Sequence, residues 1–214
     1  MRQNPCIRVL LADDHSLVRA GIRRVLEEAG DMLVVGEAGN GDDAIQLTSC
    51  LQPDVVMLDI SMPKMDGMET IGRLLALVPQ VKILVVTMHP EEHFALRTMK
   101  AGCHGYLTKD VLPHELREAV RTVASGRHYL SARGKDIVAS QIVSTNVAPG
   151  TASLSDRELQ VLCLVARGLK LKEVAAQLDL SVRTVETYEL RLKQKLGLRN
   201  KVDISRFAHQ NKLI

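Results

Sequence analysis

Short apolar segments alternate with amphipathic, helix-like segments over the first 128 residues, and this alternation limits the possible folds more than any other feature of the chain. The apolar segments, predicted to be buried strands, lie near residues 7–13, 32–38, 54–59, 82–87 and 105–108. The predicted helices lie near residues 15–28, 41–51, 67–77, 91–101 and 113–125. Strand–helix alternation favours a parallel sheet with helices on both faces. We therefore predict an α/β fold with a doubly wound, five-stranded parallel sheet.

The last 60 residues or so show helical periodicity only. Ser155-Asp156-Arg157-Glu158 is a capping box, which opens a helix that Gly168 ends. Further helices are predicted near residues 171–178, 182–197 and 201–211. The second and third are separated by a short turn, which is the helix-turn-helix arrangement. This part of the chain is therefore predicted to be an all-α, four-helix helix-turn-helix domain.

A linker between the two parts is indicated by the sequence STNVAPGTAS at residues 144–153, which is small, polar and interrupted by Pro149-Gly150. The preceding stretch 131–143 is compatible with one short helix. The predicted division is residues 1–128 for the α/β domain, 129–153 for the linker and 154–214 for the helix-turn-helix domain.

The two parts differ in charge. Residues 1–150 carry 16 Lys/Arg against 18 Asp/Glu, a net −2, whereas residues 151–214 carry 12 against 7, a net +5. A basic module joined to a mildly acidic one indicates a nucleic-acid-binding end, although surface lysines alone would give the same sign.

Cysteine spacing and hydropathy exclude several classes of protein. The four cysteines show no CxxC spacing, which argues against a disulfide framework and against a zinc site. No apolar run approaches the roughly 18 residues of a membrane span, and the start MRQNPCIRVLL lacks a signal-peptide cleavage region. We therefore expect a cytoplasmic protein that binds no membrane.

Polar side chains stand where the predicted strands end. Asp13 and Asp14 close IRVLLADD, Asp59 closes DVVMLD, Thr87 closes KILVVT and Lys109 closes HGYLTK. Because the carboxyl ends of parallel strands line one edge of a sheet, we expect these side chains to converge there. Any one of them alone can be a helix cap or a strand-end solubiliser, but that explanation is improbable for the whole set.

This set of groups suits phosphoryl chemistry. Three carboxylates repel one another, and a divalent cation together with Lys109 would neutralise them. Oxygen ligands with open water positions suit Mg²⁺, so Asp13, Asp14 and Asp59 are the predicted metal ligands. Asp59, on the central strand, is the predicted nucleophile toward a phosphoryl group, whose oxygens Thr87 and Lys109 would contact.

Four segments, VLLADDH, VVMLDISMPKMDGMET, ILVVTMH and AGCHGYLTKD, resemble in order and spacing the successive motifs of receiver domains in two-component signalling. The resemblance covers residues 7–125 and implies that a histidine kinase or phosphotransfer protein phosphorylates Asp59. It also implies that Thr87 and Tyr106 form a switch, in which the hydroxyl moves toward the phosphoryl group and the aromatic ring swings inward behind it.

Two other activities fit some of these residues. Haloacid-dehalogenase-type phosphatases also use an aspartyl nucleophile with Mg²⁺, but they need a second Asp two residues later, where Ser61 stands. The string at residues 89–93, HPEEH, matches a metalloprotease motif, which we interpret as a chance match because a helix is predicted to begin inside it. We hypothesise that Ser61 and His89, two residues after Asp59 and Thr87, tune the rate of phosphoryl loss.

The third helix of the C-terminal part has a polar face suited to DNA. If Val185, Leu192 and Leu196 form its buried stripe, with Tyr188 at the margin, the outward residues are Arg183, Glu186, Thr187, Leu190, Arg191 and Gln194. In a major groove, arginine donates to guanine, glutamate accepts from cytosine, and threonine or leucine contacts a thymine methyl. The predicted DNA-contacting residues are Lys170, Lys172, Arg183, Thr184, Glu186, Thr187, Leu190, Arg191, Arg199 and Lys201. By pattern alone, a solvated helix face in a protein-binding bundle is an equal alternative.

A resemblance to the LuxR-type DNA-binding domain covers about residues 154–212 and is carried by LSDRELQVLCLVARGLKLKEVAAQLDLSVRTVETYELRLKQKLGLRNKVDI. Joined to a receiver, it implies the NarL/FixJ-like branch of response regulators. The chain departs from the usual pattern at Lys170-Leu171, Tyr188, Glu189 and Leu190. Two of these, Lys170 and Leu190, lie on the predicted DNA-contacting surface. The DNA sequence that the domain recognises therefore cannot be inferred from that of its relatives.

We predict a DNA-binding transcriptional regulator, not an enzyme, that phosphorylation of Asp59 shifts toward a dimeric DNA-binding form. The fourth helix, Val202 to Gln210, is the expected dimer contact, which would set two recognition helices on half-sites about ten base pairs apart. The alternative is a phosphorylation-independent DNA-binding regulator whose receiver binds a partner.

Overall fold

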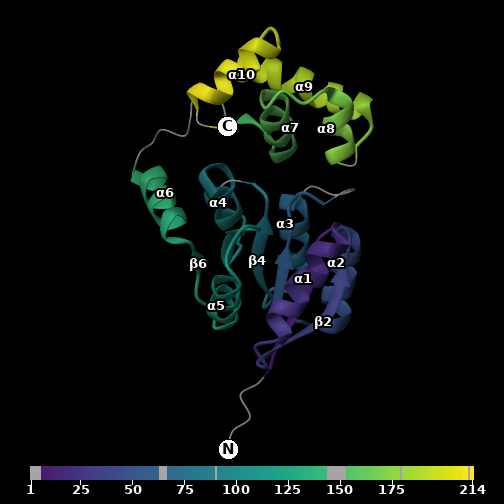
Figure 1. The fold of residues 1–214 in the computed structure, drawn as a ribbon, viewed down its shortest axis with the longest axis vertical. Coiled ribbons are helices and arrows are strands. Elements are labelled where there is room, and N and C mark those ends of the chain that lie inside the picture. Colours follow the sequence, from purple (N-terminus) through teal and green to yellow (C-terminus); the bar gives the residue numbers. More distant parts are fainter. Residues whose placement is uncertain (1–5, 63–66, 90, 144–152, 179, 212) are drawn as a thin grey trace, which may run out of the picture. The chain divides into compact units, whose positions relative to one another are not determined.

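The computed structural model describes residues 6–62, 67–89, 91–143, 153–178, 180–211 and 213–214, and the chain divides into two compact units, Met1–Ser140 and Gln141–Ile214. Figure 1 shows the mixed strand–helix unit and the all-helical unit. Most of the predicted linker sequence, residues 144–152, lies outside the described residues, so the predicted domain limits remain a prediction.

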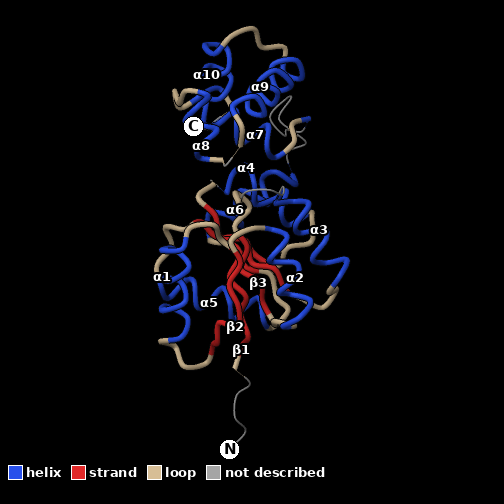
Figure 2. Tube along the Cα trace, turned by 90° about the vertical axis from the view of Figure 1, so that its right-hand side faces the viewer, coloured by secondary structure: helices blue, strands red, loops and turns tan. Residues whose placement is uncertain are grey.

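The first unit is built on one parallel sheet (Figures 1 and 2). Its strands are β1 Ile7–Ala12, β2 Met32–Ala38, β3 Val55–Leu58, β4 Lys82–Thr87, β5 Gly105–Thr108 and β6 Tyr129–Leu130. Their order is β2-β1-β3-β4-β5-β6, and all neighbouring pairs are parallel. The five predicted strands are confirmed. β6 was not predicted, because two residues are too few to show a strand periodicity.

Helices cover both faces of the sheet, as Figure 2 shows. They are α1 Ser16–Glu27, α2 Gly41–Leu51, α3 Gly67–Leu77, α4 Glu91–Lys100 and α5 Pro113–Ala124, all close to the predicted ranges. Successive side chains of a strand point to opposite faces. Val9 and Leu11 therefore belong to one hydrophobic cluster with Val120 of α5. Leu10, which is also fully buried, points to the opposite face of the sheet.

The strand order reverses at β1, since β2 lies on one side of it and β3 on the other. Ligands bind at such a reversal point, outside the carboxyl ends of the strands. Asp13 follows β1 directly and Asp59 follows β3 directly. The main-chain N–H of Asp59 donates to the carbonyl of Ala12 over 2.8 Å, which holds the two strand ends side by side.

Gly67, the first residue of α3, allows that helix to begin close to the end of β3. A Cβ atom added to Gly67 would lie 2.6 Å from the Cβ atom of Ile60 and 2.8 Å from its carbonyl oxygen. Contacts this short do not occur between real side chains, so a larger residue would push α3 away from the segment that follows Asp59. Pro63, in the same segment, lies outside the described residues.

The connection after β6 is helical. α6, Ala132–Val143, confirms the short helix that the sequence suggested over 131–143. The Ser131 hydroxyl donates to the Glu91 carboxylate over 2.7 Å and accepts from the N–H of Gly134 over 2.9 Å. The start of α6 is thereby tied to the start of α4.

The second unit consists of α7 Asp156–Ala166, α8 Leu171–Gln177, α9 Val182–Leu196 and α10 Lys201–Gln210, as predicted. Ser155 and Glu158 form the predicted capping box, and the Ser181 hydroxyl caps α9 by accepting from the N–H of Thr184. α7 packs against both α9 and α10, and Val185 and Leu192 are fully buried. None of the described helices, in either unit, is long and apolar enough to cross a membrane.

Candidate phosphoacceptor site and DNA-binding surface

The carboxylates predicted to converge do so. One ligand atom each from Asp13, Asp14, His15 and Asp59 can be chosen so that all lie within 4.8 Å of one another. Asp13 and Asp59 are 4% and 3% exposed, whereas Asp14 is open to solvent. Two buried carboxylates this close require compensating charge, since burial disfavours an isolated ion.

Lys109 provides part of that charge. Its Nζ atom lies 2.6 Å from Asp13 Oδ2 and 2.6 Å from Asp59 Oδ2. Burial lowers the pKa of Lys109, but the charge of Asp59 and the hydrogen bonds to both carboxylates outweigh burial, so the pKa lies above its ordinary value. The lysine is therefore held as an ammonium ion between the two strand-end aspartates.

The other oxygen of each buried carboxylate is oriented by the main chain. The N–H of His15 donates to Asp13 Oδ1 over 2.8 Å, and the N–H of Ser61 donates to Asp59 Oδ1 over 2.9 Å. These bonds fix the carboxylates before any ligand binds. Each oxygen keeps a lone pair for a further partner.

The donor set fits Mg²⁺. Three carboxylates and the Lys109 ammonium sum to −2, which a divalent cation would balance. Carboxylate oxygens with solvent access on the Asp14 side are the ligands that Mg²⁺ prefers. Asp13, Asp14 and Asp59 would hold the ion.

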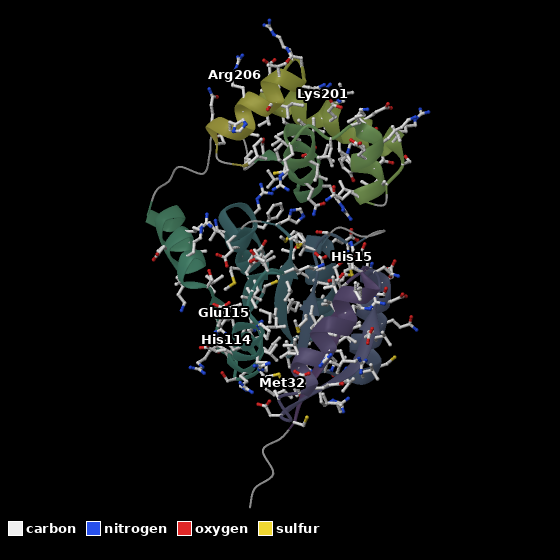
Figure 3. All side chains as sticks on the ribbon, viewed as in Figure 1. His15, Met32, His114, Glu115, Lys201 and Arg206 are labelled. Atoms are coloured by element: carbon white, nitrogen blue, oxygen red, sulfur yellow. The ribbon has the colours of Figure 1, made fainter. Side chains whose placement is uncertain are left out.

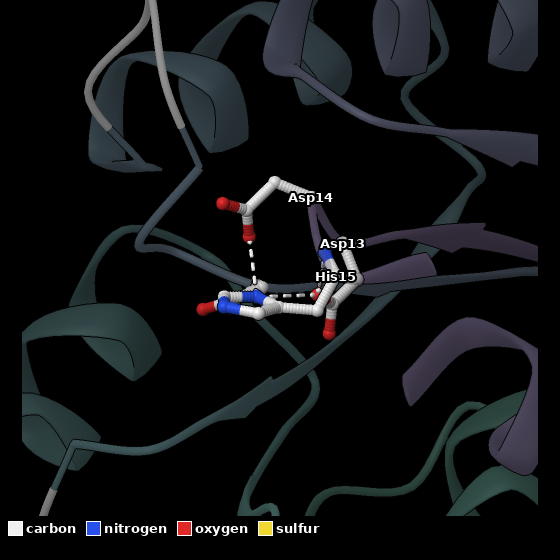
Figure 4. Close-up of side chains that lie close together, drawn as sticks. Asp13, Asp14 and His15 are labelled. Carbon is white, nitrogen blue, oxygen red and sulfur yellow. Dashed lines mark hydrogen bonds and ion pairs between the residues drawn. The ribbon is translucent and has the colours of Figure 1, made fainter. Parts of the chain in front are cut away.

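His15 was not identified from the sequence. Its Nδ1 atom lies 2.8 Å from Asp14 Oδ1 and 3.3 Å from Asp13 Oδ1 (Figure 4). The one sequence signal was its position directly after the Asp13-Asp14 pair, where the turn into α1 brings the ring back over both carboxylates.

Thr87, the last residue of β4, is fully buried beside this cluster. Its Oγ1 atom lies 3.4 Å from Ser61 Oγ, which in turn lies 3.1 Å from His89 Nε2. The His89 ring stacks on Phe94 with centroids 4.5 Å apart. Ser61 and His89 are thus brought together beside Thr87. α4 begins at Glu91, inside the HPEEH string, as expected for a chance match.

Tyr106 of β5 is fully buried, and its hydroxyl donates to the main-chain carbonyl of His89 over 2.9 Å. The ring therefore occupies the inward position that the receiver resemblance assigns to a phosphorylated switch. This hydrogen bond ties the ring to the loop that follows Thr87.

The predicted DNA-contacting residues lie on the surface of the second unit. Nine of the ten are exposed and Thr184, whose hydroxyl contacts that of Ser181, is half-buried. The nine are Lys170, Lys172, Arg183, Glu186, Thr187, Leu190, Arg191, Arg199 and Lys201. Lys201 begins α10, as Figure 3 shows.

Two basic residues of α9 are already engaged within the unit. Lys193 pairs with Glu189, and Lys195 Nζ lies 2.6 Å from Glu158 Oε2. Arg183 and Arg191, in contrast, have no side-chain partner among the described residues, which leaves their charges for a ligand.

Glu189 is one of the departures from the LuxR-type pattern. It is buried, so it does not join the exposed face of α9. The spacing of Glu189 and Lys193, four residues apart on a helix, was the sequence signal for their ion pair.

Comparison with known proteins agrees with this two-part arrangement. Residues 9–121 match the response regulator receiver domain, and residues 152–208 match bacterial regulatory proteins of the luxR family. The chain is 40% identical over 203 residues to response regulator UvrY of Escherichia coli K12, which covers 94% of this chain and 93% of that protein. It is 36% identical over 213 residues to response regulator GacA of Pseudomonas aeruginosa PAO1, covering 97% and 98%.

A solved structure extends the similarity to three dimensions. RcsB from Salmonella enterica serovar Typhimurium, bound to the promoter rprA in the presence of the phosphomimetic BeF₃⁻, is 26% identical. The match covers 95% of this chain and 98% of that chain, with a TM-score of 0.63.

Proposed function

The chain belongs to the response-regulator family, in which a receiver domain is joined to a LuxR-type DNA-binding domain, and we propose that phosphorylation of Asp59 switches its binding to DNA. Members of this family are transcription factors rather than enzymes. The observation that carries the proposal is the buried Asp59 carboxylate, which Lys109 contacts and which shares a four-residue cluster with Asp13 and Asp14.

Each residue of the pocket has a task in the proposed reaction. A carboxylate oxygen of Asp59 attacks the phosphorus atom of a phosphohistidine on the histidine kinase or phosphotransfer protein. The P–N bond breaks, and the imidazole nitrogen leaves with the bonding electron pair. Lys109 and the Thr87 hydroxyl bind phosphoryl oxygens, while Asp13 and Asp14 hold Mg²⁺ with Asp59. The ion supplies positive charge that stabilises the transferring group.

Thr87 and Tyr106 form the proposed switch. The Thr87 hydroxyl bonds to the phosphoryl group, and this contact favours the inward position of the Tyr106 ring, in which its hydroxyl donates to the His89 carbonyl, over an outward one. A phosphoryl group shifts two conformations only by the difference in its contacts with each. A difference of about 2–3 kcal/mol changes their ratio roughly 30- to 150-fold.

The output of the switch is DNA binding by the second unit. The exposed face of α9 would enter the major groove, and Lys170, Lys172, Arg199 and Lys201 would contact phosphates. A homodimer, with α10 as its contact, would place two copies of α9 on half-sites about ten base pairs apart. A solved structure contains two RcsB dimers bound to two parallel DNAs, which supports a dimeric form of this protein on DNA. The proposed setting is the cytoplasm.

The test is DNA binding to a randomised duplex pool, with and without acetyl phosphate and Mg²⁺. We expect wild-type protein to enrich a sequence more strongly when phosphorylated, and Asp59→Ala to lose this gain. Asp42→Ala, which removes an exposed carboxylate of α2, is the matched control and should behave as wild type.

Equal enrichment by wild type and Asp59→Ala under all conditions would overturn the switch. It would favour the alternative, a phosphorylation-independent DNA-binding regulator whose receiver binds a partner. Failure of both proteins to enrich any sequence would overturn the DNA-binding assignments of α9.

A further inference from the structure

Leu190 is an apolar side chain in the middle of the exposed polar face of α9, and it is 56% exposed. On a helix its neighbours are the residues three and four positions away. Those on the same face are Glu186, Thr187 and Gln194, all exposed and polar. Burial in the core of the unit therefore does not explain a leucine at this position.

The surroundings of Leu190 do not suit a protein partner. Apolar docking surfaces on proteins are contiguous patches of several hundred Å². The exposed neighbours of Leu190 on α9 are polar, and the side chains of Arg183 and Arg191 on the same face have no partner among the described residues. The two arginine charges therefore favour a polyanion as the ligand, and Leu190 favours one that offers a single apolar group.

Thr187 adds to this small apolar area. Its hydroxyl donates to the main-chain carbonyl of Arg183 over 2.9 Å, within the helix. The donor hydrogen is thereby used, and the methyl group becomes the part of Thr187 that is most available to a ligand. Leu190 lies three residues further on, so both side chains occupy neighbouring positions.

The major groove of DNA offers one apolar group on a base-pair edge, the 5-methyl group of thymine. We propose that Leu190 is a specificity-determining residue that packs on a thymine 5-methyl group in each half-site, with the Thr187 methyl beside it. This inference rests on the proposed function, in that α9 enters the major groove. It adds a base identity that the resemblance to other regulators does not provide.

The experiment replaces thymine by uracil, which removes the 5-methyl group and leaves base pairing unchanged. Each thymine of the enriched duplex is replaced in turn, and the Kd of phosphorylated wild-type protein is measured at one salt concentration. We expect at least one replacement in each half-site to weaken binding about fourfold, the value for one CH₂ or methyl group returned to water. No sensitive thymine in any enriched duplex would overturn the inference.

Variants then assign the effect to a residue. Leu190→Ala should bind thymine and uracil duplexes with Kd values within about 1.5-fold, whereas Gln194→Ala, one turn further on the same face, should keep the fourfold preference. Leu190 is exposed, so its replacement should leave the unfolding temperature unchanged. A thymine preference that persists in Leu190→Ala would overturn the assignment.

The two proposals fail separately. The uracil comparison is made at a fixed phosphorylation state, so a protein that binds DNA equally well without phosphorylation can still show the thymine preference. Conversely, a phosphorylation-dependent protein that treats thymine and uracil alike keeps the switch and loses the role of Leu190. Recovery of no enriched sequence at all would overturn both the DNA-binding assignment and this inference.

Discussion

The hydroxyl of Ser131 donates a 2.7 Å hydrogen bond to the carboxylate of Glu91, which joins the first residues of α4 to the residue before α6. The same hydroxyl accepts from the N–H of Gly134, so it also caps the first turn of α6. Gly134 is buried against the Glu91 carboxylate, where an added Cβ atom would lie 3.2 Å from the carboxylate oxygens. The side chain of Glu91, which comes just after the loop that follows Thr87, therefore anchors the N-terminus of α6.

Ser131→Ala should loosen the start of α6. It removes one hydrogen bond and leaves the N–H of Gly134 without its acceptor, which costs about 1 kcal/mol. Amide hydrogen exchange in the first turns of α6 should then be about fivefold faster. Ser125→Ala, at the C-terminal end of α5, removes a serine hydroxyl elsewhere and should leave exchange in α6 unchanged. Unchanged exchange in Ser131→Ala would mean that the contact with Glu91 does not anchor the helix.

Lys109→Met should destabilise the first unit and make it depend on Mg²⁺. Removal of the ammonium leaves the buried Asp13 and Asp59 without their partner, which costs about 3–5 kcal/mol. Mg²⁺ replaces part of the lost charge, so millimolar Mg²⁺ should raise the unfolding temperature of the variant more than that of wild type. Lys100→Met, which removes an exposed ammonium from α4, is the matched control. The geometry assigned to Lys109 is contradicted if both variants melt alike and respond alike to Mg²⁺.

Ser61→Ala and His89→Ala should each lose the phosphoryl group faster. The two side chains contact each other beside Thr87 over 3.1 Å, and smaller residues would give an attacking water more room. We expect the first-order rate constant to rise about threefold, a change of under 1 kcal/mol in the barrier. The measurement is the decay of phosphoprotein after removal of the phosphodonor. Unchanged rates in both variants would refute the tuning hypothesis.

Acid should loosen the second unit through Glu158. Burial raises the pKa of this carboxyl group, but the hydrogen bonds from Lys195 and from the N–H of Ser155 outweigh it and hold the pKa below the ordinary 4.5. A carboxyl whose pKa is depressed on folding stabilises the fold above its unfolded pKa, and this contribution disappears as the pH falls through its folded pKa. Stability should therefore decline as the pH drops below about 4.5.

Glu158→Gln provides the control, because glutamine keeps the capping box with Ser155 and cannot ionise. The variant should be less stable at neutral pH and show a shallower decline in acid. The NMR signals of Tyr188, in α9, would follow the unit within the full chain. Parallel declines in variant and wild type would show that other groups set the acid response.

Arg183→Ala and Lys172→Ala should affect DNA binding in different ways. Arg183 is exposed at the start of the proposed groove-contacting face, so its loss should cost about 1–3 kcal/mol and relax the preference at one base pair. Lys172, in α8, is assigned to phosphate. Its loss should weaken binding to all sequences and reduce the slope of log K against log salt by about one for each copy bound. Identical salt slopes and specificities in the two variants would contradict these assignments.

Most of the strands and helices could be predicted from sequence periodicity. Apolar runs of four to seven residues predicted strands β1 to β5, and capping residues such as Ser155, together with glycines such as Gly168, whose φ is +91°, predicted where helices begin and end. These signals are local, because side-chain spacing and backbone preference act over one or two turns. β6 escaped prediction because its two residues are specified by pairing with Gly105 and Tyr106, which are distant in the sequence.

The pocket, too, was predicted from the sequence only in part. Strand-end positions determined that Asp13, Asp59 and Lys109 meet at one sheet edge, since parallel strands bring their carboxyl ends together. Only the tertiary structure decided that Lys109 bridges both aspartates and that Tyr106 bonds to the His89 carbonyl, because these contacts depend on how neighbouring strands are registered. The exposed face of α9 shows the same limit. The 3.6-residue period placed Leu190 outward, but the burial of Glu189 and the engagement of Lys195 by Glu158 arise from packing between helices, which no local pattern encodes.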